Sequence, residues 1–104
     1  RYSLPPLSRQ RVVVMGASSG IGRATARLFA RRGARVMVAS RQAEALASLV
    51  EEIRAEGGVA AYTVADVSSH ADMRAAADAA VREFGGLDAW VHVAGVGVYG
   101  KFWD

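Results

Sequence analysis

The sequence predicts an α/β fold in which helices cover both faces of a doubly wound parallel sheet. Short apolar runs rich in β-branched residues alternate with longer segments whose apolar residues recur at helical spacing. The predicted strands are apolar at nearly every position, which is typical of strands buried on both faces. A glycine follows each predicted helix and can end it. The expected order is β-α-β-α-β-α-β with right-handed crossovers.

The first half of the chain contains two strands and two helices. The strands are residues 11–15, RVVVM, and residues 34–39, ARVMVA. The first helix covers residues 20–32 and has an apolar face with Ile21, Ala24, Leu28 and Phe29. A second face of the same helix is basic and carries Arg23, Arg27 and Arg31. The second helix covers residues 42–56, with an apolar stripe formed by Leu46, Leu49, Val50 and Ile53.

The second half continues the alternation with strands at residues 59–65 and 87–94. Between them, Ser69 is positioned to cap a helix that ends at Gly85. A fourth helix is expected after the fourth strand, where the sequence given ends. We therefore expect four strands and three helices, an incomplete sheet, and an exposed fourth strand that leaves Trp90 uncovered. Residues 1–10, with two prolines, are expected to form an extended lead-in to a single unit at residues 11–104.

Composition narrows the functional classes. The 104 residues are 52% hydrophobic and 22% charged, and they contain no cysteine, so disulfides, thiolate chemistry and cysteine metal sites are absent. No run of 18 apolar residues is present, so a membrane span is not expected. The net charge of +3 is spread along the chain, which favours a solvated surface over a nucleic-acid site. A cytoplasmic location, with no metal, is expected.

The stretch GASSGIG, residues 16–22, joins the first strand to the first helix. A dinucleotide pyrophosphate needs close approach to backbone N–H groups and to a helix N-terminus. Gly16, Gly20 and Gly22 are expected to supply the tight turn, the close approach and the close helix packing. Ser18 and Ser19 can donate hydroxyl hydrogen bonds to phosphate or hold the loop itself. The alternative is a glycine-rich turn that binds nothing.

This glycine spacing resembles that of the short-chain dehydrogenase/reductase family, and the resemblance extends over residues 11–104. The family commonly has Thr where Met15 stands. At the end of the fourth strand it has Asn-Asn-Ala-Gly, where this chain has His92, Val93, Ala94 and Gly95. The resemblance implies a Rossmann-like fold and a nicotinamide dinucleotide cofactor. His92 is expected to be a core residue rather than a catalyst.

The resemblance also implies where the adenosine part of the cofactor binds. Ser40 and Arg41 follow the second strand, with no carboxylate to repel a 2′-phosphate, so NADP is expected and NAD is less favoured. Asp66 would bond the adenine amino group and Val67 would pack on the ring. The alternatives are that Arg41 is an ordinary solvated residue and that Asp66 is a turn or capping residue. The complete expected cofactor site is Gly16, Ser18, Ser19, Gly20, Ile21, Gly22, Ser40, Arg41, Asp66, Val67, Ala94 and Gly95.

The family's catalytic groups, a Ser and a Tyr-x-x-x-Lys pair, have no counterpart in the sequence. The only lysine is Lys101, and none of the three tyrosines precedes a lysine by four positions. We therefore assign no catalytic residue and expect the chain alone to be inactive. The expected parent is an oxidoreductase that moves hydride between NADP and a carbonyl or alcohol, acts as a homo-oligomer, and binds neither nucleic acid nor membrane. The alternative is a non-catalytic nucleotide-binding or regulatory module on the same scaffold.

Overall fold

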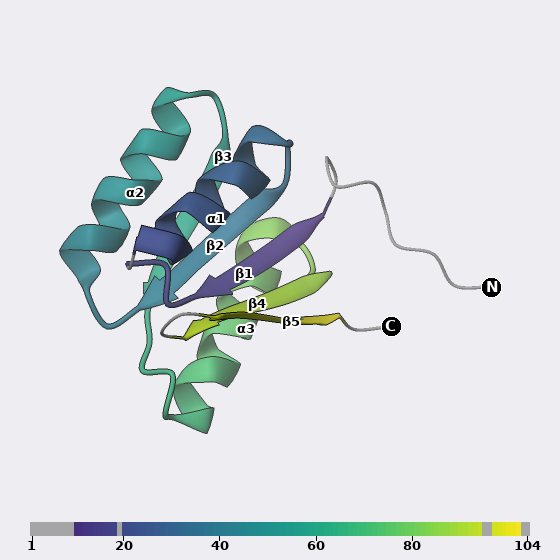
Figure 1. Cartoon of the computed structure of the whole chain (residues 1–104). Helices are drawn as coiled ribbons and strands as arrows, with labels where there is room; N and C mark the ends of the chain where they lie inside the picture. Colours follow the sequence, from purple (N-terminus) through teal and green to yellow (C-terminus); the bar gives the residue numbers. More distant parts are fainter. Residues whose placement is uncertain (1–9, 19, 95–96, 103–104) are drawn as a thin grey trace.

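A computed structural model describes residues 10–18, 20–94 and 97–102 (Figure 1). In this part of the chain, three helices pack on one five-stranded sheet. The strands are β1 (Arg11–Met15), β2 (Arg35–Ser40), β3 (Val59–Val64), β4 (Ala89–Ala94) and β5 (Gly97–Phe102). The helices are α1 (Gly20–Arg31), α2 (Ala43–Ala55) and α3 (His70–Phe84).

The first four strands form the predicted parallel sheet in the order β3-β2-β1-β4, and β5 lies beyond β4. The strand β1 lies between β2 and β4, and its Val14 is opposite Val38 on one side and Val91 on the other. The chain winds outward from β1 to β3 and then crosses back to β4. The strand order therefore reverses beside β1, and open α/β sheets bind ligands at the carboxyl ends of the strands at such a point.

The strand β5 is the main difference from the expected topology. It pairs antiparallel with β4, with Ala89 opposite Phe102 and Ala94 opposite Gly97. Only two positions separate the two strands in sequence, which suits a hairpin and is far too short for a crossover helix. The expectation of an uncovered β4 edge is therefore wrong, and Trp90 is only 8% exposed.

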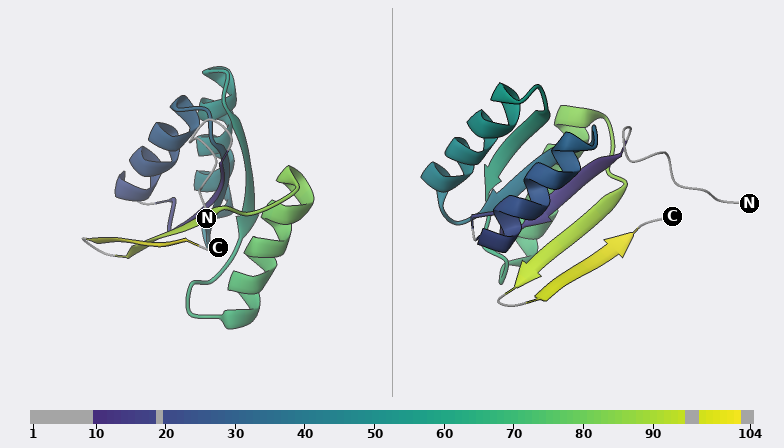
Figure 2. Two further views of the ribbon diagram at one scale, coloured as in Figure 1. Left: turned by 90° about the vertical axis from the view of Figure 1, so that its right-hand side faces the viewer. Right: turned by 45° about the horizontal axis from the view of Figure 1, so that its top comes forward.

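The core has two layers, one on each face of the sheet. On one face, Val12 and Val14 pack with residues of α1 and α2. On the other face, Val13 and Met15 pack with residues of α3. This alternation along β1 follows from the two-residue period of a strand. Figure 2 shows α1 and α2 on one side of the sheet and α3 on the other, so the doubly wound prediction is confirmed.

Helix α1 packs through a different face from the apolar one marked in the sequence. Its buried residues are Gly22, Ala26 and Ala30. Ile21 and Leu28 are 44% and 52% exposed. Small residues let the helix lie close to the sheet, whereas larger side chains on that face would hold it away. Of the apolar face marked in the sequence, only Phe29 packs against the core. The face is otherwise exposed, because residue size mattered more than hydrophobicity.

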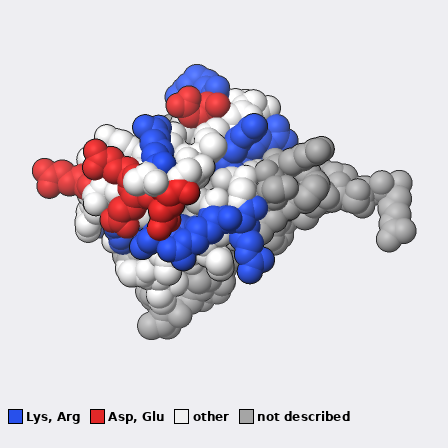
Figure 3. Space-filling model, turned by 90° about the horizontal axis from the view of Figure 1, so that it is seen from above, with Lys and Arg blue, Asp and Glu red and all other residues white. Residues whose placement is uncertain are grey.

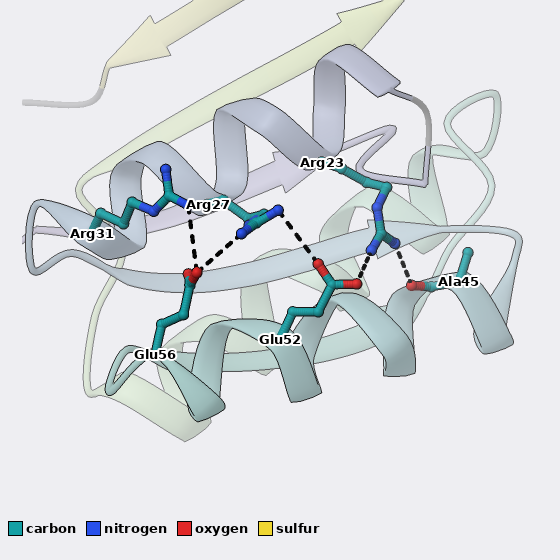
Figure 4. A network of polar contacts seen from close by, with 6 residues as sticks. All are labelled: Arg23, Arg27, Arg31, Ala45, Glu52 and Glu56. Atoms are coloured by element: carbon teal, nitrogen blue, oxygen red, sulfur yellow. Dashed lines mark hydrogen bonds and ion pairs between the residues drawn. The ribbon is translucent and has the colours of Figure 1, made fainter.

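The basic face of α1 contacts α2 through a row of ion pairs (Figure 4). Arg23 and Arg27 both reach Glu52. Arg27 and Arg31 reach Glu56, with N···O distances of 3.0 and 3.4 Å, and lower the pKa of its carboxyl group through their hydrogen bonds. Acidic and basic side chains lie next to each other on the face of the molecule in Figure 3. The arginines of α1 thus hold two helices together.

The amino ends of β1 and β4 are joined by a second polar cluster. The Asp88 carboxylate accepts hydrogen bonds from the Arg11 backbone N–H at 2.8 Å and from its Nε at 2.8 Å and Nη2 at 3.1 Å. In return, the Asp88 N–H donates to the Arg11 carbonyl at 2.8 Å. The guanidinium hydrogen bonds lower the pKa of Asp88. The Asp88 side chain is only 10% exposed, so this pair fixes β1 against β4.

Candidate functional site

The loop after β1 is held tightly to the neighbouring strands. The N–H groups of Gly16 and Ala17 donate to the Ala39 carbonyl at the end of β2, at 2.8 and 3.3 Å. Gly16 has φ = +82°, a backbone conformation that favours glycine. A Cβ on Gly16 would also overlap the Val93 carbonyl of β4. The loop therefore leaves the sheet in a turn that only glycine fits, which agrees with the role expected for Gly16.

Gly20 and Gly22 lie two positions apart on α1 and have different surroundings. A Cβ on Gly22 would overlap the Gly16 carbonyl and approach the Ala17 Cα to 2.8 Å. A Cβ on Gly20, by contrast, would have no atom of another segment within 4 Å. Packing within the described chain therefore requires glycine at position 22 and not at position 20. The open space at Gly20 lies at the N-terminus of α1, where the helix dipole favours an anion.

A pocket of about 660 Å³ lies at the carboxyl ends of β2 and β3. Five of the residues that line it, Ser18, Ser40, Arg41, Asp66 and Val67, belong to the site expected from the sequence. The others are Gln42, Ala65 and Ser68. The pocket thus brings together residues that are far apart in the chain, next to the glycine loop, and its volume suits a small-molecule ligand.

Ser40 and Arg41 present contrasting groups to this pocket. Ser40 is 6% exposed, and its Oγ accepts a hydrogen bond from the Gln42 N–H at 3.1 Å. Its carbonyl accepts from the Ala65 N–H at 2.8 Å, which ties the ends of β2 and β3 together. Arg41 is exposed. A fixed hydroxyl next to an exposed cation is a suitable arrangement for a phosphate monoester.

Asp66 lies in a network at the end of β3. Its Oδ1 accepts hydrogen bonds from the Ser68 N–H at 2.9 Å and from the Ser68 hydroxyl at 2.7 Å. These two bonds lower the pKa of Asp66, and the charge of Arg41 contributes further in the same direction. Asp66 is therefore a carboxylate at neutral pH. It acts as a turn residue through Oδ1, while Oδ2 takes no part in these two bonds.

The remaining expected residues are placed only in part. Ile21 lies in the first turn of α1, and the backbone of Ala94 ends β4. Ser19 and Gly95 lie outside the described residues. His92 lies on β4 opposite Met15 and is partly buried. Gln42 and Ser68 line the pocket but were missed in the sequence, although the Asp-x-Ser spacing at residues 66–68 is a recognisable turn signal.

The residues present fit a dinucleotide phosphate. The space at Gly20 is one that a side chain would fill, and it adjoins the positive end of α1. The pocket lined by Arg41 and Asp66 offers one cation and one hydrogen-bond acceptor. Among the described residues, no cluster of three or more His, Asp or Glu side chains could hold a metal ion. No helix in the described ranges has the length and hydrophobicity needed to cross a bilayer.

Comparison with known proteins identifies the family. The family model for short chain dehydrogenases matches residues 10–104. The chain belongs to this family. Uncharacterized oxidoreductase YxnA of Bacillus subtilis is 40% identical over 104 residues, which are all of this chain and 29% of that protein. The A-factor type gamma-butyrolactone 1′-reductase of Streptomyces virginiae is 53% identical over 77 residues, 74% of this chain and 30% of the reductase.

Solved short-chain dehydrogenase structures support the same assignment. A metagenomic short-chain oxidoreductase in complex with NADP matches 89% of this chain and 42% of its own, with a TM-score of 0.78 and 41% identity. A short-chain dehydrogenase/reductase from Burkholderia phymatum in complex with NAD matches 82% of this chain and 30% of its own, with a TM-score of 0.77 and 35% identity. The sequence-based assignment of fold and family is therefore confirmed. The chain spans about a third of the length of these relatives.

Proposed function

We propose that this chain is the cofactor-binding portion of an oxidoreductase that prefers NADP to NAD and acts on a carbonyl or alcohol substrate. The observation that carries the proposal is that the glycine loop, which leaves open space at Gly20, contributes Ser18 to the pocket that Arg41 and Asp66 also line. A pyrophosphate at the N-terminus of α1 would thereby have its adenosine end directed toward residues suited to it. Bound in this way, the nicotinamide supplies or accepts the hydride.

The residues of the proposed cofactor site bind different parts of the dinucleotide. The backbone at Gly20 and the positive end of α1 bind the pyrophosphate, with Ser18 as a further donor. Arg41 binds the 2′-phosphate through its permanent positive charge, and the Ser40 hydroxyl can donate a hydrogen bond to the same phosphate. Asp66 accepts from the adenine amino group, and Val67, which is 42% exposed, packs on the ring.

The preference for NADP is tested by the two dissociation constants, for NADPH and NADH, measured at one ionic strength in the full-length gene product. An exposed Arg–phosphate contact gives roughly 5- to 150-fold tighter NADPH binding. Arg41→Ala should remove most of this difference. The matched control is Arg32→Ala, which makes the same charge change at an exposed position after α1. Equal affinities in the wild type would refute the preference.

The enzymatic part of the proposal requires a Tyr-x-x-x-Lys pair as proton donor, and residues 1–104 contain no such pair. We expect the reading frame beyond Asp104 to encode a Ser followed by Tyr-x-x-x-Lys, and we expect NADPH oxidation, followed at 340 nm, with a panel of carbonyl compounds. A full-length product that binds NADPH but lacks those residues and oxidises no substrate would instead be a non-catalytic nucleotide-binding module.

A further inference from the structure

Two adjacent serines at the end of β3 have different hydrogen-bonding partners. The Ser69 Oγ accepts from the Asp72 N–H at 3.1 Å and caps α3. The Ser68 hydroxyl instead donates to Oδ1 of Asp66 at 2.7 Å. Ser68 is exposed and lines the pocket, so this bond forms at the surface of the candidate cofactor site. Ser69 therefore serves the helix, whereas Ser68 contacts a residue of the site.

The backbone of Asp66 is fixed independently of Ser68's hydroxyl. The Asp66 N–H donates to Oδ2 of Asp72 at 2.8 Å, and the Asp66 carbonyl accepts from the Ser69 N–H at 3.0 Å. With the backbone held in this way, the remaining freedom of Asp66 is rotation of its carboxyl group. The Ser68 hydroxyl and N–H both bind Oδ1 and limit that rotation.

We propose that Ser68 is a positioning residue for recognition of the adenine base, because it orients the Asp66 carboxylate so that Oδ2 accepts a hydrogen bond from the exocyclic amino group. This inference rests on the function proposed above. A preoriented acceptor binds more tightly than a rotating one, since less side-chain freedom is lost on binding. It also discriminates between bases, because an analogue with a carbonyl oxygen in place of the amino group brings two acceptors together.

The experiment compares NADPH with reduced nicotinamide hypoxanthine dinucleotide phosphate, which carries that carbonyl oxygen. The dissociation constants of both are measured for the full-length protein and for Ser68→Ala, Ser68→Thr, Ser68→Val and Ser69→Ala. The wild type should favour the adenine form roughly tenfold or more, the range expected for a hydrogen bond to a charged group. Ser68→Ala should reduce this ratio about threefold or more, because the N–H bond alone leaves the carboxylate less constrained.

Three further variants separate positioning from stability. Ser68→Thr keeps a hydroxyl and should restore the ratio, and Ser68→Val, which has the same shape as threonine, should not. Ser69→Ala removes a helix cap and should lower the melting temperature without changing the ratio. A ratio that is the same in the wild type and Ser68→Ala would overturn the inference while leaving the proposed function in place. Absence of NADPH binding in the folded wild type would instead refute the proposed function.

Discussion

The two ends of the parallel sheet are built in contrasting ways. At the amino end, Arg11 and Asp88 exchange four hydrogen bonds between β1 and β4. A Cβ on Gly86 would overlap the Arg11 guanidinium, so the amino ends of β1 and β4 are closely packed, whereas a pocket of about 600 Å³ lies at the amino ends of β2 and β3. At the carboxyl end, the chain turns away at Gly16 and leaves open space at Gly20, and the same loop contributes Ser18 to a pocket of about 660 Å³.

This difference suggests a division of roles along the strands. At the amino ends of β1 and β4, Arg11 and Asp88 bind each other, and the loss of either should affect stability. Several polar groups at the carboxyl end face a pocket, and their loss should affect binding. Gly22 is the exception, because it lies at the carboxyl end but is required by packing against Gly16.

The largest stability effect is expected at the amino end. Asp88→Ala removes the acceptor for three Arg11 donors and leaves a half-buried guanidinium without its partner. We expect the free energy of unfolding to fall by about 3 kcal/mol, measured by urea denaturation. The matched control, Asp78→Ala on the exposed face of α3, should change it by less than about 0.5 kcal/mol. Equal effects would show that the pairing of Asp88 with Arg11 does not stabilise the amino end.

The same pair should contribute to stability in acid. The pKa of Asp88 is lower in the folded protein than in the unfolded chain, so its contribution is complete above the unfolded value of about 3.9. That contribution is lost as the pH falls through the lower folded value. The pKa of Arg11 is raised, so its part is lost only at extreme alkaline pH. Unfolding of Asp88→Asn should therefore depend less on pH below about 4 than unfolding of the wild type.

Gly22→Ala should give the next largest effect and mark the boundary between the two roles. Its Cβ would overlap the Gly16 carbonyl, so α1 or the loop must move. We expect a loss of about 2 kcal/mol in the free energy of unfolding, with weaker NADPH binding as a consequence of the displaced loop. A melting temperature equal to that of the wild type would show that this glycine is not required for packing.

The smallest effect is expected between α1 and α2. Glu52→Gln weakens the contacts with Arg23 and Arg27, but the Glu52 side chain is 41% exposed and solvent screens the pair. We expect a loss of about 0.5 kcal/mol that disappears in high salt. A loss as large as that of Asp88→Ala would mean that this surface row of ion pairs stabilises the fold as much as the Arg11–Asp88 pair does.

The sequence predicted the regular part of the fold but not its exceptions. The parallel strands and the Ser69 cap were predictable because strand periodicity and capping are local properties. The packing face of α1 could not be predicted from the sequence. Its buried residues, Gly22, Ala26 and Ala30, have little apolar surface, so a hydrophobic pattern points to the larger Ile21 and Leu28 instead. The strand β5 follows a connection of two residues, and its antiparallel pairing depends on the free edge of β4.

The candidate site shows the same limit. The glycine loop and the residues after β2 and β3 could be named because βα turns at the carboxyl ends of strands are recognisable in sequence. The different surroundings of Gly20 and Gly22 could not be predicted, since they depend on how closely α1 approaches the loop. Ser68 was missed because its role depends on one side-chain contact with Asp66.

The most direct test of the central claim, that the carboxyl end is left open for a dinucleotide, is the NADPH dissociation constant of Gly20→Ala, measured with its melting temperature. The added methyl group meets no atom of another segment within 4 Å, and alanine suits a helix, so the melting temperature should be unchanged or slightly higher. The same methyl group would hold the pyrophosphate away from α1 and should weaken NADPH binding roughly tenfold or more. A Gly20→Ala variant that binds NADPH as tightly as the wild type would contradict the account.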